Sequence, residues 1–190
     1  MQFDVERLQS DLELLERDDW IDHFVKQNYE GSWSVLPLRG PSHAGHPVMM
    51  IYSDPNCRDF SDTIFLEKAK YIQEVLAQFE CPLLAVRLMK LTAGSEIKEH
   101  TDHDLSLEDG TVRLHVPVVT HQDIEFYLNG ERVVMQEGDC WYLKLSEPHA
   151  VKNPTSMDRV HLVIDAEVND WLVNLIGRAR ENRIPDESML

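Results

Sequence analysis

Two side chains that could bind a metal ion, His100 and Asp102, are separated by one residue in the segment Glu99-His100-Thr101-Asp102. In an extended segment, residues i and i+2 point to the same side, so both side chains can reach one ion. A His-x-Asp pair also occurs in polar loops that bind no metal. The pair alone therefore does not establish a site.

A third candidate ligand, His149, follows an expected strand over 139–145 by one turn. A β-barrel can bring that strand beside the one that carries His100. Two histidines and one carboxylate on one face of a metal leave three coordination positions open, which is the ligand set of non-haem iron oxygenases. A structural zinc site would be closed by four protein ligands, so this set does not suit one.

Arg159 lies on a further expected strand, beyond His149. An arginine inside a barrel is costly unless it meets an anion, and a guanidinium pairs well with a carboxylate. A dicarboxylate such as 2-oxoglutarate would supply that partner. The other face of the strand carries Val160, Leu162 and Ile164, which are apolar and suit a hydrophobic core better than the face with Arg159. The hypothesis therefore requires the barrel interior to be the polar side, and an exposed strand arginine is the alternative.

Arg113 and His115 share one face of another expected strand, which indicates a surface that faces a ligand. The alternative is a solvated strand face. Arg39, Arg87 and Trp141 are further candidates for substrate binding. Arginines of this kind are usually surface residues, and a tryptophan in a strand usually belongs to the core.

The elements that must position these residues follow from hydrophobic periodicity. The Asn129-Gly130 pair between two strands predicts a tight hairpin. Helices are predicted over 3–27, 63–78 and 165–180. Strands are predicted over 32–38, 46–52, 83–91, 112–119, 124–128, 131–135, 139–145 and 160–164.

Helices at both ends and a run of short antiparallel strands between them predict a mainly β fold with flanking helices, built on a sandwich or barrel. The length of 190 residues suits a single domain, 1–190. Within it we expect helices and strands over 1–80 to pack on a barrel core over 81–165. A C-terminal helix and tail are expected over 166–190.

Composition narrows the class of partner. The formal net charge of -16 would repel nucleic acid and anionic lipid, so we expect neither as a partner. The first residues lack a basic start followed by an apolar run, and no apolar stretch approaches the roughly 20 residues of a membrane helix. The three cysteines are odd in number and widely spaced, which predicts neither a disulfide framework nor a metal knuckle. A cytoplasmic protein is expected.

Four segments, in this order, together resemble the aspartyl/asparaginyl β-hydroxylase family, including its bacterial free-proline hydroxylase relatives. They span roughly Leu83 to Asp165 and contain the metal pair, the Arg-x-His strand, the distal histidine and the final arginine. The segments are RLMKLTAGSEIKEHTDHD, GTVRLHVPVV, NGERVVMQEGDCWYLKLSEPHAVKN and DRVHLVIDA.

The resemblance implies a double-stranded β-helix (jelly roll, cupin-like) with iron(II) at its mouth. Arg159 matches the arginine that binds the distal carboxylate of 2-oxoglutarate, while Arg113 and His115 match residues that contact co-substrate or substrate carboxylates. The vertebrate-type branch lacks the carboxylate ligand, so Asp102 makes this chain more similar to the proline hydroxylase branch. The residues that match the iron ligands are His100, Asp102 and His149.

The activity implied is hydroxylation of an amino acid, free or within a peptide, with 2-oxoglutarate and O₂ as co-substrates and ascorbate as reductant. Hydroxylation of an Asp or Asn side chain in a protein partner is one alternative. A non-enzymatic cupin-like module that binds a metal or a small acid is an alternative of another class. The sequence leaves the substrate and the oligomeric state open.

Overall fold

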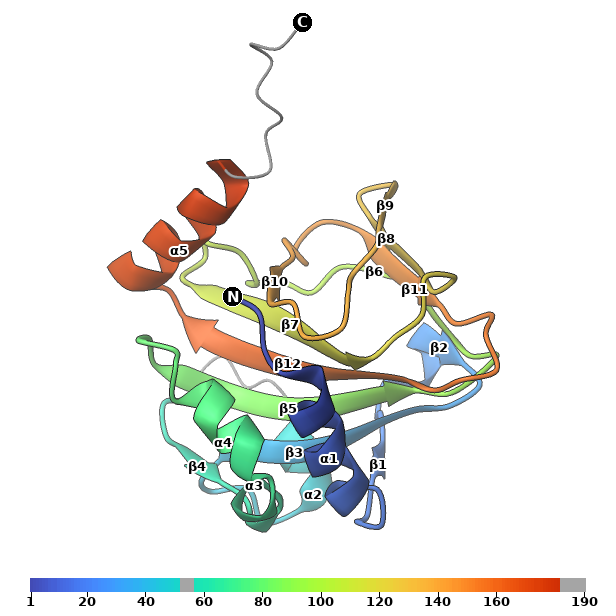
Figure 1. Cartoon of the computed structure of the whole chain (residues 1–190), viewed down its shortest axis with the longest axis horizontal. Coiled ribbons are helices and arrows are strands. Elements are labelled where there is room, and N and C mark those ends of the chain that lie inside the picture. Colours follow the sequence, from blue (N-terminus) through green and yellow to red (C-terminus); the bar gives the residue numbers. More distant parts are fainter. Residues whose placement is uncertain (52–56, 182–190) are drawn as a thin grey trace, which may run out of the picture.

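A computed structural model describes residues 1–51 and 57–181, in which two β-sheets face each other and helices pack on the outside (Figure 1). The larger sheet has the order β1 (Ile21–Asp22), β3 (Trp33–Pro41), β5 (Leu83–Leu91), β12 (Arg159–Glu167), β7 (Thr111–Val119) and β10 (Trp141–Tyr142), and β4 (Phe60–Asp62) also pairs with β3. The smaller sheet has the order β2 (Tyr29–Glu30), β6 (Glu96–His100), β11 (His149–Lys152), β8 (Glu125–Leu128) and β9 (Glu131–Val133). The helices are α1 (Val5–Leu15), the 3₁₀ turn η1 (Lys26–Asn28), α2 (Pro47–Ile51), α3 (Ile64–Lys68), α4 (Lys70–Leu76) and α5 (Asp170–Glu181).

From β5 onward the chain moves back and forth between the two sheets. Strands β5, β7, β10 and β12 lie in the larger sheet, and β6, β8, β9 and β11 lie in the smaller one. This arrangement of eight antiparallel strands is a jelly roll. It confirms the predicted mainly β fold with a double-stranded β-helix core. The N-terminal β3 extends the larger sheet beyond β5, so this part of the chain contributes strands as well as helices.

Strand β12 is buried on both of its faces. Val160, Leu162 and Ile164 belong to the hydrophobic cluster beneath the helices. Val163 belongs to the cluster between the two sheets, and Arg159 lines a cavity there. The space between the sheets therefore receives the polar residues of this strand, which is the condition that the hypothesis for Arg159 required.

Helices α1, α3, α4 and α5 cover the outer face of the larger sheet. Leu8, Leu12 and Leu15 of α1 are buried in this layer together with residues of α3, α4 and α5. The Asp4 side chain caps α1 by accepting a hydrogen bond from the Arg7 backbone, and Asp residues are favoured at this position. These contacts hold the sheet from outside and leave its inner face to the site.

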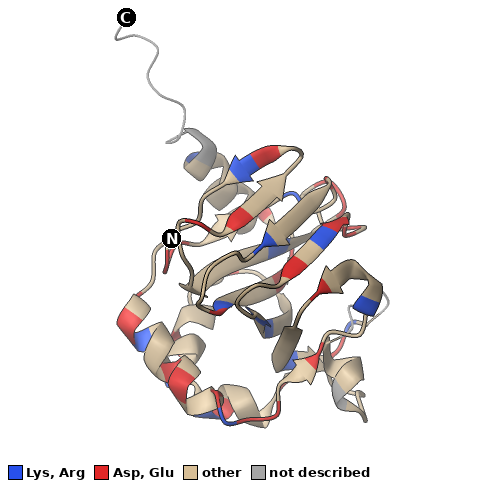
Figure 2. Cartoon of the chain, turned by 90° about the vertical axis from the view of Figure 1, so that its right-hand side faces the viewer, with Lys and Arg blue, Asp and Glu red and all other residues tan. Residues whose placement is uncertain are grey.

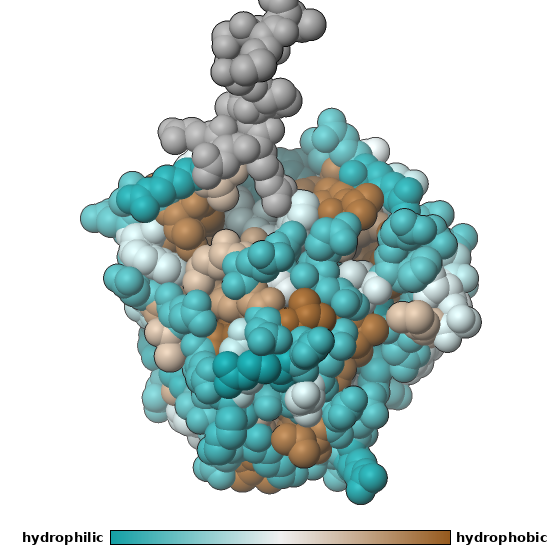
Figure 3. Space-filling view, in the orientation of Figure 1, coloured by the Kyte–Doolittle hydropathy of each residue, from teal (hydrophilic) through white to brown (hydrophobic). Residues whose placement is uncertain are grey.

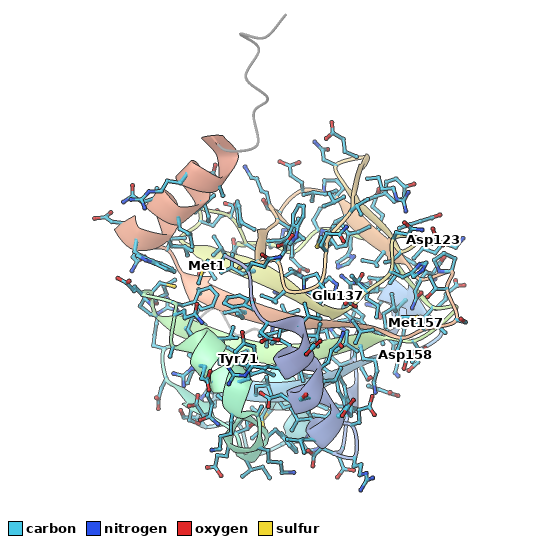
Figure 4. The ribbon with its side chains drawn as sticks, in the orientation of Figure 1. Met1, Tyr71, Asp123, Glu137, Met157 and Asp158 are labelled. Carbon is cyan, nitrogen blue, oxygen red and sulfur yellow. The ribbon has the colours of Figure 1, made fainter. Side chains whose placement is uncertain are left out.

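Tyr71, which is labelled in Figure 4, links two of these helices. The Tyr71 hydroxyl, on α4, accepts a hydrogen bond from the Asp4 backbone N–H at 2.7 Å. The Arg7 guanidinium lies over the Tyr71 ring, 4.0 Å from its centroid. Tyr71 therefore fixes the start of α1 against α4.

The predicted helix over 3–27 is wrong beyond Leu15, where α1 ends. Ile21 instead pairs with Val35 of β3, and the ring of His23 stacks on Trp33 with centroids 3.6 Å apart. Apolar residues at helical spacing are used here for sheet pairing and aromatic packing, because tertiary contacts override a weak local preference.

The predicted strand over 46–52 is also wrong, because residues Pro47–Ile51 form the short helix α2. An apolar run of this length fits a strand or a buried helix equally well, and proline is favoured at the first helical position. Tyr52 and the rest of the predicted loop up to residue 56 lie outside the described residues, as does the predicted tail over 182–190.

The outer surface is mainly hydrophilic. Acidic and basic residues are interspersed on helices and strands in the view of Figure 2. In the view of Figure 3 the apolar residues form separate patches among hydrophilic ones. Within residues 1–51 and 57–181, none of the helices is long and apolar enough to cross a membrane.

Candidate metal centre and ligand cavity

His100 and His149 lie directly opposite each other on the neighbouring strands β6 and β11. Their ring centroids are 4.3 Å apart. The Nδ1 atom of His100 lies 2.8 Å from the Lys98 carbonyl oxygen, and that of His149 lies 3.0 Å from the Glu147 carbonyl oxygen. A carbonyl can only accept, so each ring carries its proton on Nδ1. Each Nε2 atom is therefore left with a lone pair for a metal, in an orientation fixed by the backbone.

Asp102 follows β6 and completes a group of three ligands. Its backbone N–H donates to the Leu145 carbonyl at 2.9 Å, which ties the segment after β6 to the segment before β11. Asp102 Oδ1 lies 3.8 Å from His100 Nε2, and the candidate ligand atoms of Asp102, His100 and His149 all lie within 4.8 Å of one another. This donor set fits a divalent first-row metal with open coordination positions.

The protonation state of His149 suits a ligand. Burial lowers its pKa, the hydrogen bond to the Glu147 carbonyl raises it, and the nearby His100 lowers it, with a net decrease. A metal binds the neutral imidazole, so a lowered pKa keeps His149 competent over a wider pH range.

A buried arginine–carboxylate network lies beside Asp102. Arg113 donates from Nη1 to Asp102 Oδ2 at 2.6 Å. It also donates to both carboxylate oxygens of Asp165, from Nε at 2.7 Å and from Nη2 at 3.0 Å. Arg87 Nη1 donates to Asp165 Oδ2 at 3.0 Å. Burial raises the pKa of Asp165, but the charges of Arg113 and Arg87 outweigh this and lower it to about 2.

Arg159 is buried between the sheets and has no carboxylate within ion-pair distance among residues 1–51 and 57–181. Its Nη2 atom lies 3.1 Å from His161 Nδ1, and its guanidinium carbon lies 5.9 Å from the centroid of the Phe126 ring. Burial lowers the pKa of Arg159 to about 9. A buried cation without an anion indicates a place where an anionic ligand binds.

Two buried histidines adjoin Arg159. His115 Nδ1 and His161 Nδ1 are 3.3 Å apart, and burial holds the pKa of both rings well below the usual value, so both are neutral. Because a guanidinium can only donate, His161 Nδ1 accepts from Arg159 and its proton is on Nε2. Neither Nε2 atom has a hydrogen-bond partner in the described part of the chain.

The start of β12 is held by the loop before it. The buried Asn153 amide donates to the Leu91 carbonyl at 3.2 Å and to the Met157 carbonyl at 2.8 Å. The Asp158 carboxylate accepts from the Ala93 backbone N–H at 3.1 Å. Met157 and Asp158 lie together at this end of the molecule in Figure 4. Arg159, the next residue, is thus presented from a fixed backbone.

One cavity, of about 50 Å³, connects the three candidate metal ligands with Arg159. It brings together every predicted metal ligand and every predicted co-substrate residue. Its polar lining consists of His100, Asp102, Arg113, His115, His149 and Arg159. Its remaining lining consists of Trp33, Met89, Ile97, Phe126, Leu145, Val151 and Val163.

The family model described as aspartyl/asparaginyl beta-hydroxylase matches residues 2–168. The chain belongs to this family. The match includes all three candidate ligands and Arg159, and it extends well beyond the segments that carried the resemblance in the sequence.

Two solved structures are also similar to this member of the hydroxylase family. A predicted oxalate decarboxylase from Thermotoga maritima has 14% sequence identity and a TM-score of 0.43, over 79% of this chain and 91% of that one. KdgF from Halomonas sp. has 12% identity and a TM-score of 0.41, over 83% of this chain and 93% of that one. The family assignment itself rests on the sequence match.

The three candidates for substrate binding are placed elsewhere. Arg39 pairs with Asp62 at 2.6 Å and is not part of the cavity lining. Arg87 points between the sheets but is held by Asp165. Trp141 is partly buried and packs against the inner hydrophobic cluster. A role in substrate binding for each of them in this hydroxylase stays a prediction.

Several residues of the site are not among the candidates predicted from the sequence. Asp165 and His161 share the inner face of β12 with Arg159, and Phe126 and Trp33 form apolar parts of the cavity wall. A signal was present for the first two, because Arg159, His161 and Asp165 recur at every second position. Phe126 and Trp33 carried no such signal, since aromatic residues in strands usually belong to the core.

Proposed function

We propose that this hydroxylase is an iron(II)- and 2-oxoglutarate-dependent dioxygenase that hydroxylates an amino acid, either free or within a peptide. The observation that carries the proposal is Arg159, a buried cation without a carboxylate partner among the described residues, in the same cavity as three convergent metal ligands. A ligand that has a carboxylate for the arginine and a chelating group for the metal would satisfy both. A 2-oxo dicarboxylate has this chemistry.

The proposed cofactor supplies O₂ activation, coupled to the decarboxylation of 2-oxoglutarate to succinate and CO₂ and to insertion of one oxygen atom into a C–H bond. The protein supplies orientation. His100 and His149 present Nε2 lone pairs from hydrogen-bonded strands, and Asp102 contributes a negative charge. Three protein ligands would leave coordination positions of the metal available to the co-substrate and O₂.

Arg159 would hold the distal carboxylate of the co-substrate. A guanidinium donates two parallel hydrogen bonds to a carboxylate, and this pairing is strong where water is excluded. Phe126 limits the space beside the guanidinium, and His161 already occupies one of its N–H groups. The remaining donors of Arg159 are thus available to an anion that enters the cavity.

The substrate would approach from the open side of the metal centre. The cavity of about 50 Å³ is far smaller than the roughly 300 Å³ at which small-molecule pockets begin. The site therefore leaves little enclosed space for a second molecule beside the co-substrate. This favours a substrate held at the rim, and a side chain of a peptide or protein partner, including Asp or Asn, fits as well as a free amino acid.

The proposal is tested by succinate formation from 2-oxoglutarate with iron(II), ascorbate and O₂, across a panel of free amino acids and short peptides. Stimulation by one compound supports the proposal and identifies the substrate, and succinate formed without any of them supports the co-substrate alone. Binding of metal and 2-oxoglutarate without any succinate would refute the proposal. That result would favour the alternative of a non-enzymatic module that binds metal and a small acid.

A further inference from the structure

The network beside the metal centre runs across three neighbouring strands of the larger sheet. Arg113 of β7 lies directly opposite Asp165 of β12, and Arg87 of β5 reaches the same carboxylate from the other side. Arg113 then bridges the gap between the sheets to reach Asp102. A buried strand residue is thereby connected to a candidate metal ligand through one guanidinium.

Two hydrogen bonds to Asp165 fix the orientation of the Arg113 guanidinium group. Its Nε and Nη2 atoms both donate to Asp165, in the two-pronged arrangement that holds a guanidinium plane in place. The Nη1 atom of the same plane therefore points in a set direction, and it donates to Asp102 Oδ2. The other carboxylate oxygen, Asp102 Oδ1, is the one that lies 3.8 Å from His100 Nε2.

Asp102 needs such support more than the histidine ligands do. It lies beyond the end of β6, and its side chain is 28% exposed, whereas that of Asp165 is 5% exposed. Each histidine ring is held by a backbone carbonyl. Arg113 provides the corresponding contact for the Asp102 carboxylate.

The charges of these residues also indicate that Asp102 belongs to the network. The charge of Asp165 matches that of Arg87, and a second arginine that is largely buried beside this pair would be costly without a second carboxylate. Among the ion pairs between described residues, Asp165 and Asp102 together match the charges of Arg87 and Arg113. Arg113 therefore connects Asp165 of the buried strand to the candidate metal ligand Asp102, in addition to its contacts within the sheet.

We propose that Asp165 is a positioning residue of the metal centre. By holding the plane of Arg113, it fixes one oxygen of Asp102 and leaves the other directed to the metal. This inference rests on the metal-binding part of the proposed function and is independent of 2-oxoglutarate. It also gives Arg113 an orienting role in place of the co-substrate contact expected from the sequence.

The test uses a pair of variants that separates positioning from stability. Asp165→Asn alone would leave two arginines with one carboxylate, so the background is Arg87→Met. In Arg87→Met/Asp165→Asn, Arg113 and Asp102 remain as a neutral pair. Co²⁺ is titrated into each metal-free full-length protein, and its dissociation constant and d–d absorption spectrum are recorded. We expect the double variant to bind Co²⁺ roughly 10–100-fold more weakly than Arg87→Met, with a changed spectrum.

A second pair of proteins shows whether the effect acts through Asp102. Adding Asp102→Ala to both variants removes the ligand that Asp165 is proposed to orient. The Asp165→Asn change should then weaken Co²⁺ binding much less than it does when Asp102 is present, because only its effect on the local charge remains. A purely structural role would weaken binding equally in both backgrounds. Equal Co²⁺ affinity and identical spectra for Arg87→Met and Arg87→Met/Asp165→Asn would overturn the inference.

Arg113→Lys provides a variant that does not alter the number of charges. A lysine ammonium cannot hold two carboxylates in one fixed plane, so the same weakening of Co²⁺ binding is expected. Wild-type affinity in this variant would also contradict the inference. If wild-type protein binds Co²⁺ but forms no succinate, the proposed function fails while the positioning role stands.

Discussion

Replacing Arg159 with methionine should stabilise the protein when no ligand is present. Methionine is of similar length and apolar, and it removes a buried charge whose anion is absent from the described chain. Arg159 is protonated in both the folded and the unfolded state below about pH 9. Its desolvation therefore lowers the free energy of unfolding throughout the neutral range.

The size of the effect follows from the pKa of Arg159. Burial lowers this pKa from the ordinary value of a guanidinium to about 9. Because one pKa unit corresponds to about 1.4 kcal/mol, the charge costs on the order of 5 kcal/mol. Relaxation of the surroundings reduces this cost, and loss of the hydrogen bond to His161 removes about 1 kcal/mol of the gain. We therefore expect Arg159→Met to raise the free energy of unfolding by about 1–4 kcal/mol.

The assay is urea denaturation of metal-free protein at pH 7, followed by circular dichroism, together with thermal unfolding. Each kcal/mol corresponds to roughly 2–4 °C in a protein of this size. Arg132→Met is the matched control, because Arg132 is an exposed arginine that, among the described residues, donates to the Gln122 and Ile124 carbonyls and forms no ion pair. Its effect should stay within about 0.5 kcal/mol.

The complementary measurement adds a ligand. Millimolar 2-oxoglutarate should raise the unfolding temperature of the wild type and leave that of Arg159→Met unchanged, because only the wild type has the guanidinium that binds it. A loss of more than about 1 kcal/mol in the ligand-free variant would show that the charge is already compensated. The argument for an anion site at Arg159 would then fail.

Three further results are expected. Asp102→Ala and His149→Ala should each abolish succinate formation, and full activity in either variant would contradict the site assignment. His115 and His161 stay neutral in the folded protein because they are buried, whereas the same side chains take up protons below about pH 6.5 in the unfolded chain. The free energy of unfolding should therefore fall by about 1.4 kcal/mol per histidine for each pH unit below that value. His161→Gln should reduce this slope in urea titrations, and an unchanged slope would exclude a contribution from that ring. Gly138→Ala should lower the unfolding temperature, because Gly138 has a φ of +78° and an added Cβ would lie 2.5 Å from the Phe3 carbonyl oxygen. An unchanged unfolding temperature would show that the N-terminal segment can move away from the added methyl group without loss of stability.

The candidate metal ligands could be named from the sequence because each depends on a local pattern. His100 and Asp102 form an i, i+2 pair, and His149 follows a strand closely. The pairing of His100 with His149 across β6 and β11 depends on strand order, which is a long-range property. The resemblance to a family implied that the two histidines bind one metal ion, whereas residue spacing gave no information on the strand order.

The burial of the inner face of β12 could not be predicted from the residues of this strand alone. Val160, Leu162 and Ile164 were correctly recognised as core residues, and this counted against Arg159 as an interior residue. The helix layer buries one face while the second sheet buries the other, so both faces are interior. No pattern within one strand can show that a second layer covers its polar side.

The interpretation of Arg113 had a different difficulty. Its position beside His115 indicated an inward-facing residue, and it does face the cavity. Its partners Asp102 and Asp165 lie on other segments of the chain, so the sequence could not show that its donors are directed to carboxylates of the protein itself. The segment around His23 was missed for a related reason, because its packing on Trp33 depends on the path of the whole chain.

The pairing of His100 with His149 has a consequence for how this family can diversify. The separation of the two imidazoles is set by main-chain hydrogen bonds between β6 and β11, and the lengths of the connecting loops do not enter. Insertions between residues 103 and 109, or at the tip of the hairpin around Gly130, would lengthen the rim without moving these rings apart. Changes in these loops would therefore alter the surface available for recognition while the two imidazoles keep their separation.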